Sequence, residues 1–522
     1  MKLESYVGGR WVKGRGVGRD LVNPTNGAIL GQVDATGIDP HAALAHARDT
    51  GGPALRALTF AERGDLLRQI ADVLSANRAE YGEIARLNSG NTGVDASIDI
   101  DGAIGTLKVY ARIGKSLGDA RLIMEPGHEA LSRDGGFGAG HILTSRTGAA
   151  LHINAFNFPA WGLWEKVAVA LLSGVGAVAK PASATAWLSH QMVRHVVEAG
   201  VLPQGALSLV CGAGEELLDA LQPFDHLAFT GSSDTAARLR AHPNVLAAAP
   251  RINIEADSVN ATILGPDARP GTAVFDLLVQ EAGKALSVKA GQLCTNIRRV
   301  FVPAPLLDAV RDALAARIDE ISVGDPAEEG VSLGPLVNAR QQHAALHGLS
   351  RLTEEARVVR GGGVPDRLTG GDRERGAFVA ATLLVCEHPD QARFVHEMEV
   401  FGPVLTVMPY EAQADAAALA ARGGGSLVAS VFTNDAEFAA GIAGDIAPCH
   451  GRVLIVDESV GKAHTGHAIV MPQCVHGGPG RAGNGQELGG LRGLGFYMQR
   501  TAVQGSPVIL ERLRSMAAEG TV

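Results

Sequence analysis

The sequence predicts an α/β protein built on parallel sheets, and three observations support this fold class. From about residue 150 onward, short apolar runs alternate with amphipathic stretches, and residues 257–468 repeat the pattern. Such alternation is typical of parallel strands joined by helices that cover both faces of a sheet. The chain has 522 residues, too many for one hydrophobic core, so we expect two or three domains. Ligands of such sheets bind at the carboxyl ends of the strands.

The expected elements follow in order along the chain. Residues 60–85 carry apolar side chains at helical spacing, which predicts an amphipathic helix. The alternating region predicts strands over 151–155, 176–179, 206–210 and 226–230, and helices over 162–172, 185–199, 215–221 and 233–241. In the second region, the apolar spacing from Phe275 to Leu286 predicts a long helix that stops at Gly291 and leaves Cys294 in a loop.

One glycine-rich stretch, residues 477–490, has two interpretations. It is either backbone that approaches a ligand closely or a flexible surface loop. Composition alone does not decide between them.

Composition and charge exclude several classes of function. A net charge of −9 argues against a nucleic-acid binder, because phosphate neutralisation needs a basic face. Residues 1–16 lack the apolar core of a secretory signal, and the most apolar run, residues 167–179, is too short to cross a bilayer. The five cysteines form no close pair, which indicates a reducing compartment and excludes the usual zinc spacings. We therefore expect a cytoplasmic protein with no metal, nucleic-acid or membrane partner.

Cys294 lies in the segment Lys289-Ala-Gly-Gln-Leu-Cys-Thr295. A thiolate is a good nucleophile, and the thioester that it forms can be hydrolysed by water. A single loop cysteine is nevertheless more often structural than catalytic. The neighbouring residues change this balance, because the segment resembles the nucleophile motif Ala-Gly-Gln-x-Cys of the aldehyde dehydrogenase superfamily.

Further segments resemble motifs of the same family, in the family's order and over essentially the whole chain. They are Asn154–Pro159 at the oxyanion hole, Lys180–Ser183 at the adenosine ribose, Phe229–Ser232 at the pyrophosphate, Glu255 as the general base and Glu399–Val404 at the nicotinamide ribose. The resemblance implies the aldehyde dehydrogenase fold. That fold combines a Rossmann-like cofactor domain, an α/β catalytic domain and a small β extension for oligomerisation.

The resemblance gives three residues a chemical role. Cys294 would attack the aldehyde, and Asn157 would stabilise the resulting oxyanion, an effect worth roughly 3–4 kcal/mol per donor. After hydride transfer, Glu255 would activate the water that hydrolyses the thioester. Glu255 follows alternating apolar residues and so ends a strand, where partial burial is expected to raise its pKa towards neutrality. Without the resemblance, Asn157 would be a turn residue and Glu255 a solvated carboxylate.

Two more residues match positions that the family uses near its site. Lys166, on the helix after Pro159, matches a lysine that supports the proton path or the cofactor. Taken alone, it would more often be a surface charge. Glu487 matches a second glutamate near the substrate tunnel, which could share the role of base with Glu255.

Ser183 indicates which cofactor is used. NAD-preferring relatives commonly carry a glutamate at this position, where it binds the ribose 2′-hydroxyl and repels a 2′-phosphate. Here Ser183 is neutral, Lys180 supplies positive charge and Thr185 adds a hydroxyl, which together favour NADP by the charge logic of other dinucleotide sites. The expected cofactor contacts are Ile153, Asn154, Ala155, Phe156, Lys180, Pro181, Ala182, Ser183, Gly212, Gly214, Phe229, Gly231, Ser232, Ala256, Glu399 and Phe401.

Departures from the common family pattern resemble one narrower branch. The segments 152–159, 255–258, 289–295, 476–483 and 497–507 are similar to the aldehyde dehydrogenase part of ring-cleavage enzymes for CoA-bound aromatic acids. Because the chain ends at Val522, we expect the standalone form rather than one fused to a hydratase. The resemblance implies a CoA-linked semialdehyde, 3,4-dehydroadipyl-CoA semialdehyde, oxidised to the free acid.

The family architecture also implies a domain division and an assembly. We expect a cofactor domain from residues 1–134 and 150–255, a catalytic domain from 256–468, and an oligomerisation β extension from 135–149 and 496–512. Such an extension usually pairs with a neighbouring subunit, so a homodimer is expected.

Three alternatives remain open from the sequence. A CoA-acylating aldehyde dehydrogenase generally lacks a base at the position of Glu255. A redox-independent thiol hydrolase or acyltransferase would need a histidine beside Cys294, and none of the 17 histidines lies in a motif that pairs with it. An inactive structural relative would have little reason to keep Cys294, Asn157 and Glu255 together.

Overall fold

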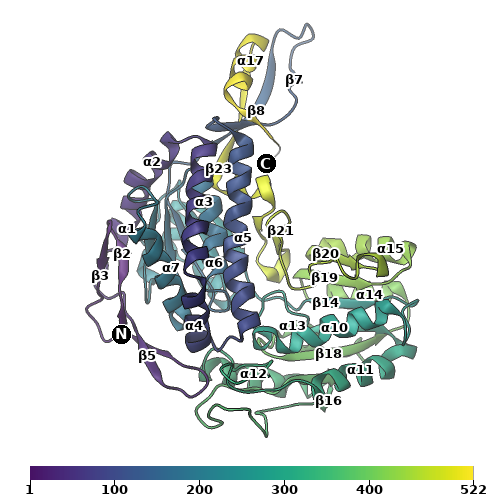
Figure 1. Cartoon of the computed structure of the whole chain (residues 1–522). Helices are drawn as coiled ribbons and strands as arrows, with labels where there is room; N and C mark the ends of the chain where they lie inside the picture. The colour runs from purple at the N-terminus through teal and green to yellow at the C-terminus, as the bar shows by residue number, and fades with distance from the viewer. Residues whose placement is uncertain (521) are drawn as a thin grey trace.

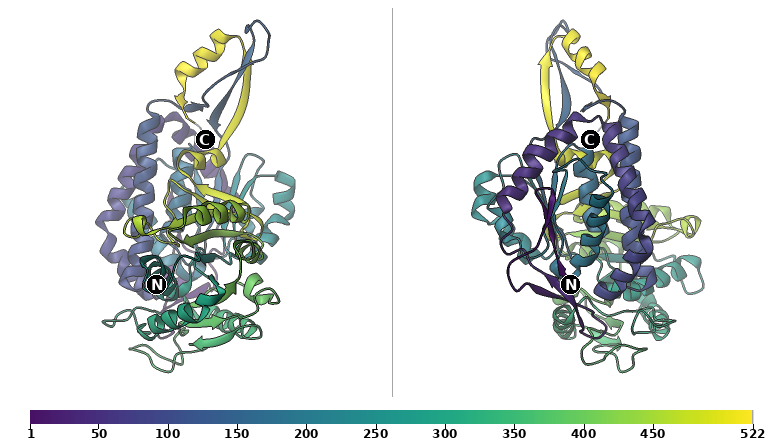
Figure 2. Two further views of the ribbon diagram at one scale, coloured as in Figure 1. Left: turned by 90° about the vertical axis from the view of Figure 1, so that its right-hand side faces the viewer. Right: turned by 60° about the vertical axis from the view of Figure 1, so that its left-hand side comes forward.

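A computed structural model describes residues 1–520 and 522 of the chain. Two α/β lobes meet side by side, and an arm projects from the end of the larger lobe (Figure 1). The side views show the arm standing clear of both lobes (Figure 2). The α/β fold predicted from the sequence is confirmed.

The larger lobe is built on a seven-stranded sheet of order β13-β12-β9-β10-β11-β2-β3. Its first five strands are parallel, and β2 and β3 join antiparallel at one edge. The bounds are β2 Ser5–Val7, β3 Arg10–Val12, β9 Ala150–Ile153, β10 Ala177–Lys180, β11 Leu207–Leu209, β12 His226–Thr230 and β13 Arg251–Glu255. The carboxyl ends of the five parallel strands therefore lie along one edge, where a ligand is expected.

Helices cover this sheet on both faces, as βαβ crossovers require. They are α1 Pro40–His46, α2 Gly52–Ala57, α6 Trp161–Leu172, α7 Ala186–Glu198, α8 Ser233–Arg240 and α9 Pro243–Ala248. The helix expected over 215–221 is only a short 3₁₀ turn, Glu215–Leu218. The other predicted helices of this region are confirmed within a few residues.

The helix predicted over residues 60–85 is two helices, α3 Phe60–Ala76 and α4 Arg78–Ser89. Asn77 separates them with non-helical backbone angles, φ −107° and ψ 13°. The apolar spacing continues across the break, so hydrophobic periodicity alone did not reveal it. A capping box begins α3: Glu62 N–H donates to Thr59 Oγ1, and Thr59 N–H donates to Glu62.

The longest helix, α5 Gly93–Leu117, was not predicted from the sequence. It packs against both α3 and α6, and α3 and α5 lie side by side in Figure 1. Glycines make this packing close. A Cβ at Gly102 would lie 2.3 Å from the Trp161 ring, and one at Gly114 would lie 2.8 Å from Gly64 Cα. Asp95 completes a capping box with Thr92 at the start of the helix.

The smaller lobe contains a second seven-stranded sheet of order β16-β17-β18-β15-β14-β19-β20. All its pairings are parallel except that of β16 with β17. The strands are β14 Ala261–Leu264, β15 Arg299–Pro303, β16 Arg357–Arg360, β17 Thr382–Val385, β18 Val404–Tyr410, β19 Ser426–Phe432 and β20 His450–Val456. The helices are α10 Ala273–Ser287, α11 Leu307–Asp319, α12 Ala339–Leu352, α13 Phe394–Glu397, α14 Gln413–Ala421 and α15 Ala436–Ile446.

The glycine-rich stretch 477–490 is ordered backbone between the lobes. It lies in an antiparallel hairpin of β21 Val475–Gly478 and β22 Gly485–Leu488. A Cβ at Gly477 would lie 2.0 Å from Gly485 O, and one at Gly483 would lie 2.3 Å from Ile254 O. These glycines therefore allow the hairpin to pack against itself and against β13, and the flexible-loop interpretation is wrong.

The arm joins distant parts of the sequence. Strand β8 Gly138–Ser145 pairs antiparallel with β23 Met498–Gly505 over its full length, and β6 Leu122–Met124, β7 Glu129–Ala130 and β24 Ala518–Glu519 complete the sheet. Of the expected extension over 496–512, only β23 is strand. Helix α16 Leu494–Tyr497 precedes it and α17 Pro507–Met516 follows it.

A three-stranded sheet near the N-terminus consists of β1 Lys2–Leu3, β4 Arg19–Val22 and β5 Ile29–Val33. All five cysteines are free thiols. In the part of the chain that the structure describes, no helix has both the length and the apolar character that crossing a membrane requires.

Candidate active site

Cys294 lies in a tight turn after α10. The helix ends at Ser287, four residues before the predicted stop at Gly291. Lys289, Ala290 and Gly291 then adopt left-handed angles, with φ of +50°, +52° and +68°. A Cβ at Gly291 would lie 2.2 Å from Gly402 O, so only glycine fits there. The turn presents a partly buried Cys294 between the two lobes.

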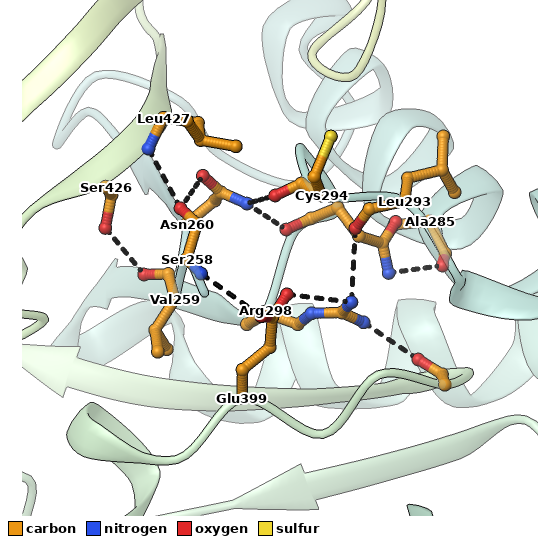
Figure 3. A network of polar contacts seen from close by, with 12 residues as sticks. Ser258, Val259, Asn260, Ala285, Leu293, Cys294, Arg298, Glu399, Ser426 and Leu427 are labelled. Carbon is orange, nitrogen blue, oxygen red and sulfur yellow. Dashed lines mark hydrogen bonds and ion pairs between the residues drawn. The ribbon is translucent and has the colours of Figure 1, made fainter. Parts of the chain in front are cut away.

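The backbone around Cys294 is held by Asn260, at the amino end of β14 (Figure 3). Its Nδ2 donates to Cys294 O at 2.8 Å and to Asn296 O at 2.9 Å. Its Oδ1 accepts from Ser258 Oγ at 2.6 Å. The sulfur of Cys294 points away from this network (Figure 3). Asn260 thus fixes the backbone and leaves the thiol available, a role that the sequence did not reveal.

Arg298 connects the Cys294 turn to the loop that carries Glu399 (Figure 3). Its guanidinium donates to Leu293 O, to Gly402 O and to Glu399 Oε1. Glu399 Oε2 also accepts from Ser258 N–H at 3.1 Å. Burial raises the pKa of Glu399 to about 7, despite the opposing effect of Arg298. Arg298 was likewise not predicted from the sequence.

Glu255 ends β13 and is buried, as its place after alternating apolar residues predicts. Its Oε2 forms an ion pair with His476 Nε2 at 2.8 Å. Burial raises the pKa of Glu255, but His476, and more weakly Lys166, outweigh burial and bring the pKa to about 2. The expectation of a pKa near neutrality is wrong, because it included burial and omitted the histidine.

No sequence motif paired a histidine with Cys294, but the structure places His476 beside it. A carboxylate oxygen of Glu255, the Sγ of Cys294 and a ring nitrogen of His476 all lie within 4.8 Å of one another. Burial first, and then the charge of Glu255, raise the pKa of the Cys294 thiol well above its usual value. The thiol is therefore protonated at rest and needs a base to become a nucleophile.

Lys166 is buried on α6 and is not the surface charge that an isolated helix lysine would suggest. Its Nζ donates to Glu487 Oε2 at 2.9 Å and to Glu165 Oε1 at 3.1 Å. Although burial lowers the pKa of Lys166, these carboxylates and Glu255 raise it above its usual value. Glu487 also accepts from Asn253 Nδ2 at 2.8 Å. The cluster places a fixed positive charge beside three carboxylates.

The loop that carries Asn157 is anchored on several sides. Thr185 Oγ1 donates to Phe156 O at 2.9 Å and Ser189 Oγ donates to Pro159 O at 2.6 Å. The carboxylate of Asp99, on α5, accepts from the backbone N–H groups of Ala160 and Trp161 at the start of α6. Rigid support of this kind suits a donor that must be pre-positioned. The Thr185 hydroxyl, which the sequence offered as a cofactor contact, donates its hydrogen bond within this loop.

Asn157, Glu255 and Cys294 line one pocket of about 500 Å³. Lys166, Glu165 and His476 lie on its wall, and apolar side chains complete it. The other lining residues are Asn154, Ala155, Phe158, Trp161, Gly162, Thr230, Thr295, Ala468 and Val470. A thiol, a side-chain amide and a carboxylate in one largely apolar pocket are groups that can perform acyl chemistry on a carbonyl group.

The expected cofactor residues follow the carboxyl edge of the first sheet. Ile153 ends β9, Lys180 ends β10, and Gly231 and Ser232 follow β12 directly. The others at this edge are Asn154, Ala155, Phe156, Pro181, Ala182, Ser183, Gly212, Gly214, Phe229 and Ala256. Glu399 and Phe401 come from the second lobe, and the Phe401 ring packs edge-on against Phe156 at 5.6 Å. The structure thus brings the set together along one edge.

This edge has features that suit a bound dinucleotide. An open cleft of about 1060 Å³ is lined by Ile153, Lys180, Gly214 and Arg238, among others. Among the described residues, Thr230 Oγ1 and both amide atoms of Asn154 are buried without a hydrogen-bond partner, as expected of groups that contact a ligand. Gly212 is explained without a ligand, because a Cβ there would lie 2.5 Å from Ala35 N.

Comparisons with known proteins agree with this geometry. The model of the aldehyde dehydrogenase family matches residues 11–503. The chain is 53% identical to 3,4-dehydroadipyl-CoA semialdehyde dehydrogenase of Aromatoleum evansii over 479 residues, 92% of this chain and 93% of that protein. The resemblance to this family inferred from the sequence motifs is therefore confirmed.

Solved structures show the same fold. PnpE from Pseudomonas sp. WBC-3 has a TM-score of 0.84 at 26% identity and covers 97% of both chains. Betaine aldehyde dehydrogenase from Staphylococcus aureus, solved in complex with NAD⁺, has a TM-score of 0.83 at 25% identity over 96% of this chain and 94% of that one. By sequence, fold and pocket, the chain belongs to the aldehyde dehydrogenase family.

Proposed function

We propose that the chain oxidises a CoA-linked semialdehyde to the free carboxylic acid with NADP as the oxidant, and that 3,4-dehydroadipyl-CoA semialdehyde is the substrate. The observation that carries this proposal is the pocket in which Cys294, Asn157 and Glu255 meet. The substrate is supported by the 53% identity to the dehydrogenase named for it.

The proposed chemistry begins at the Cys294 thiol. Because its pKa is raised, a base must remove the proton as the sulfur attacks the aldehyde carbon. Glu255 lies within reach and is ionised. The developing oxyanion would accept from the Asn157 amide and the Cys294 backbone N–H. A nicotinamide bound at the carboxyl edge of the first sheet would supply the oxidant by accepting hydride.

Deacylation is proposed to use water rather than a second thiol. Glu255 in the pocket supplies the base that hydrolysis requires. Lys166 and Glu487 are proposed to position the carboxylates of this cluster, since their ion pair spans 2.9 Å and is nearly buried. In a CoA-acylating enzyme, no such base would be needed.

NADP is proposed because Ser183 places no carboxylate at the 2′ position of the ribose. Lys180 lies nearby in the cleft, and Arg238 adds a second cation to it. Three acidic residues, Glu215, Glu216 and Asp219, also line this cleft. The direct test is a Ser183→Glu variant, which adds the missing carboxylate. It should shift cofactor preference from NADP towards NAD, and an unchanged cofactor preference would refute the role proposed for Ser183.

Domain roles and assembly are part of the proposal. Residues 1–134 with 150–255 are proposed to bind the cofactor, 256–468 to carry the nucleophile, and 135–149 with 496–512 to hold two subunits together as a homodimer. The projecting sheet of the arm suits such pairing because an exposed strand edge can join another chain (Figure 2). A cytoplasmic location is proposed from the free thiols.

The central test is turnover of the semialdehyde-CoA with NADP, followed by the absorbance of the reduced cofactor. Activity without added free CoA is expected. A requirement for free CoA would move the chain to the acylating class. Cys294→Ala should abolish turnover and leave NADP binding unchanged, and persistent oxidation would refute the role of Cys294.

One observation favours a second candidate, a thiol hydrolase or acyltransferase. His476 lies beside Cys294, the arrangement that such enzymes use. Release of acid from an acyl thioester without any nicotinamide would support it. If the protein also oxidises the semialdehyde with a nicotinamide, acid release without the nicotinamide would be a side reaction of the same thiol.

A further inference from the structure

His476 is a charged pocket residue that the proposed chemistry does not use. It lies on β21, directly across the hairpin from Glu487 on β22. Its side chain is only 7% exposed, and its Nε2 is 2.8 Å from Glu255 Oε2. The same ring lies beside the Cys294 thiol, within the 4.8 Å cluster. The hairpin thus places an imidazole beside both the proposed base and the thiol.

The other charges facing this pair explain why a histidine is needed. Glu165 and Glu487 share Lys166, with contacts of 3.1 and 2.9 Å. Within the described chain, the one ion pair of Glu255 is that with His476. Three buried carboxylates therefore meet one lysine, and an imidazolium supplies the second positive charge. Buried carboxylates without a partner are costly to ionise.

We propose that His476 is a positioning residue that keeps Glu255 ionised and aimed at the pocket beside Cys294, so that thioester hydrolysis continues below neutral pH. This inference rests on the proposed function, in which Glu255 is the base of deacylation. It gives a role to a residue whose segment, 476–483, the sequence linked to one branch of the family but not to the catalytic chemistry.

The step that depends on His476 is the attack of water on the thioester. A proton passes from water to the Glu255 carboxylate while the water oxygen bonds to the carbonyl carbon. The C–S bond then breaks, and the departing Cys294 sulfur takes the proton back from Glu255. The products are the carboxylic acid and the thiol, and His476 keeps its own proton throughout. Only an ionised Glu255 can start this sequence.

Removing the imidazolium should change when Glu255 is ionised. Burial and the neighbouring Glu165 would then dominate, opposed by the weaker effects of Lys166 and of the Cys294 side chain. The carboxyl would hold its proton to a higher pH. Deacylation in His476→Gln should therefore fall about tenfold for each pH unit below the new pKa.

The experiment measures single-turnover deacylation of the semialdehyde-CoA between pH 5 and 9, with reduced-cofactor formation recorded separately. The wild type should show a flat profile down to below pH 6. In His476→Gln the acidic limb should move up by at least one unit, with the rate recovering at pH 9. His343→Gln, on the exposed face of α12, is the matched control and should keep the wild-type profile.

Two results would overturn the inference. One is an acidic limb in His476→Gln that coincides with that of the wild type. The other is an equal loss at every pH, which would mean that His476 only supports the fold. If the variant does not fold, the wild-type profile decides, since a limb between pH 6 and 7 contradicts the proposal. Absence of any cofactor reduction in the wild type would instead refute the proposed function.

Discussion

Replacing Lys166 with methionine should destabilise the larger lobe strongly. Its ammonium lies 2.9 Å from Glu487 and 3.1 Å from Glu165, and its side chain is 2% exposed. Removal leaves two buried carboxylates without their cation, a change that costs about 3–5 kcal/mol. For a lobe of this size, each kcal/mol moves the melting midpoint by about 2–4 °C. The expected loss is therefore about 6–20 °C.

The deficit of this variant should depend on pH in a definite direction. Burial, opposed by Lys166, already raises the pKa of Glu165 in the folded protein, and removing the lysine raises it further. A carboxyl whose pKa is higher in the folded than in the unfolded state lowers the free energy of unfolding only where it must ionise. This loss of stability is absent at low pH and complete above the pKa of the folded state. The deficit should therefore grow from pH 6 to pH 9.

The assay is a thermal scan at one fixed rate, because large proteins often unfold irreversibly. Lys166→Met/Glu487→Gln should recover part of the loss, since one buried charge is removed with the lysine. Lys108→Met, an exposed position on α5, is the control and should melt with the wild type. A drop below 2 °C at pH 9, or a deficit that grows towards acid, would refute the reasoning.

Three further predictions concern the catalytic loops. Asn157→Ala should slow thioester formation about 100- to 1000-fold in stopped-flow reduction assays while the proposed cofactor NADP still binds; a loss below tenfold would contradict its proposed oxyanion role. Because the pKa of Glu399 is about 7, affinity for the proposed cofactor in fluorescence titrations should improve about fivefold from pH 6 to 8. Glu399→Gln should show no such trend, and an equal trend would exclude this carboxyl. Gly291→Ala places a Cβ 2.2 Å from Gly402 O at a φ of +68° and should sharply reduce soluble yield. In the control Gly444→Ala, the Cβ meets nothing within 4 Å and the yield should not fall. Normal yield of both variants would contradict the claim that only glycine fits at position 291.

The sequence predicted the elements that place the site because their signals are local. Strand His226–Thr230 was predicted with its exact bounds, since a short apolar run between turns is read directly. The meeting of Cys294, Asn157 and Glu255 in one pocket followed from their family motifs and from the rule that parallel strands end at one edge. Cys294 and Asn157 are 137 residues apart, and no local pattern predicts that they lie close together. Their proximity could be predicted only from the resemblance to the family.

Other features depended on tertiary contacts that no periodicity reports. Helix α5 has glycines where α3 and Trp161 approach closely, and these lowered its apparent helical propensity. The pKa of Glu255 is shifted down and not up because His476, on a hairpin more than 200 residues further along the chain, forms an ion pair with it. The hairpin itself was obscured by its glycines, which are required by backbone packing and not by flexibility.

Helix α5 holds both the loop of the proposed nucleophile, Cys294, and the loop of the proposed oxyanion donor, Asn157. Asp95 and Asp99 are one turn apart on α5, and both are fully buried. Asp95 accepts from Lys289 N–H at 2.7 Å, five residues before the thiol. Asp99 accepts from Trp161 N–H at 2.7 Å, four residues after Asn157. Because the two carboxylates are one helical pitch apart, about 5.4 Å, α5 fixes the distance between the Cys294 loop and the Asn157 loop. Neither loop could maintain this distance by itself.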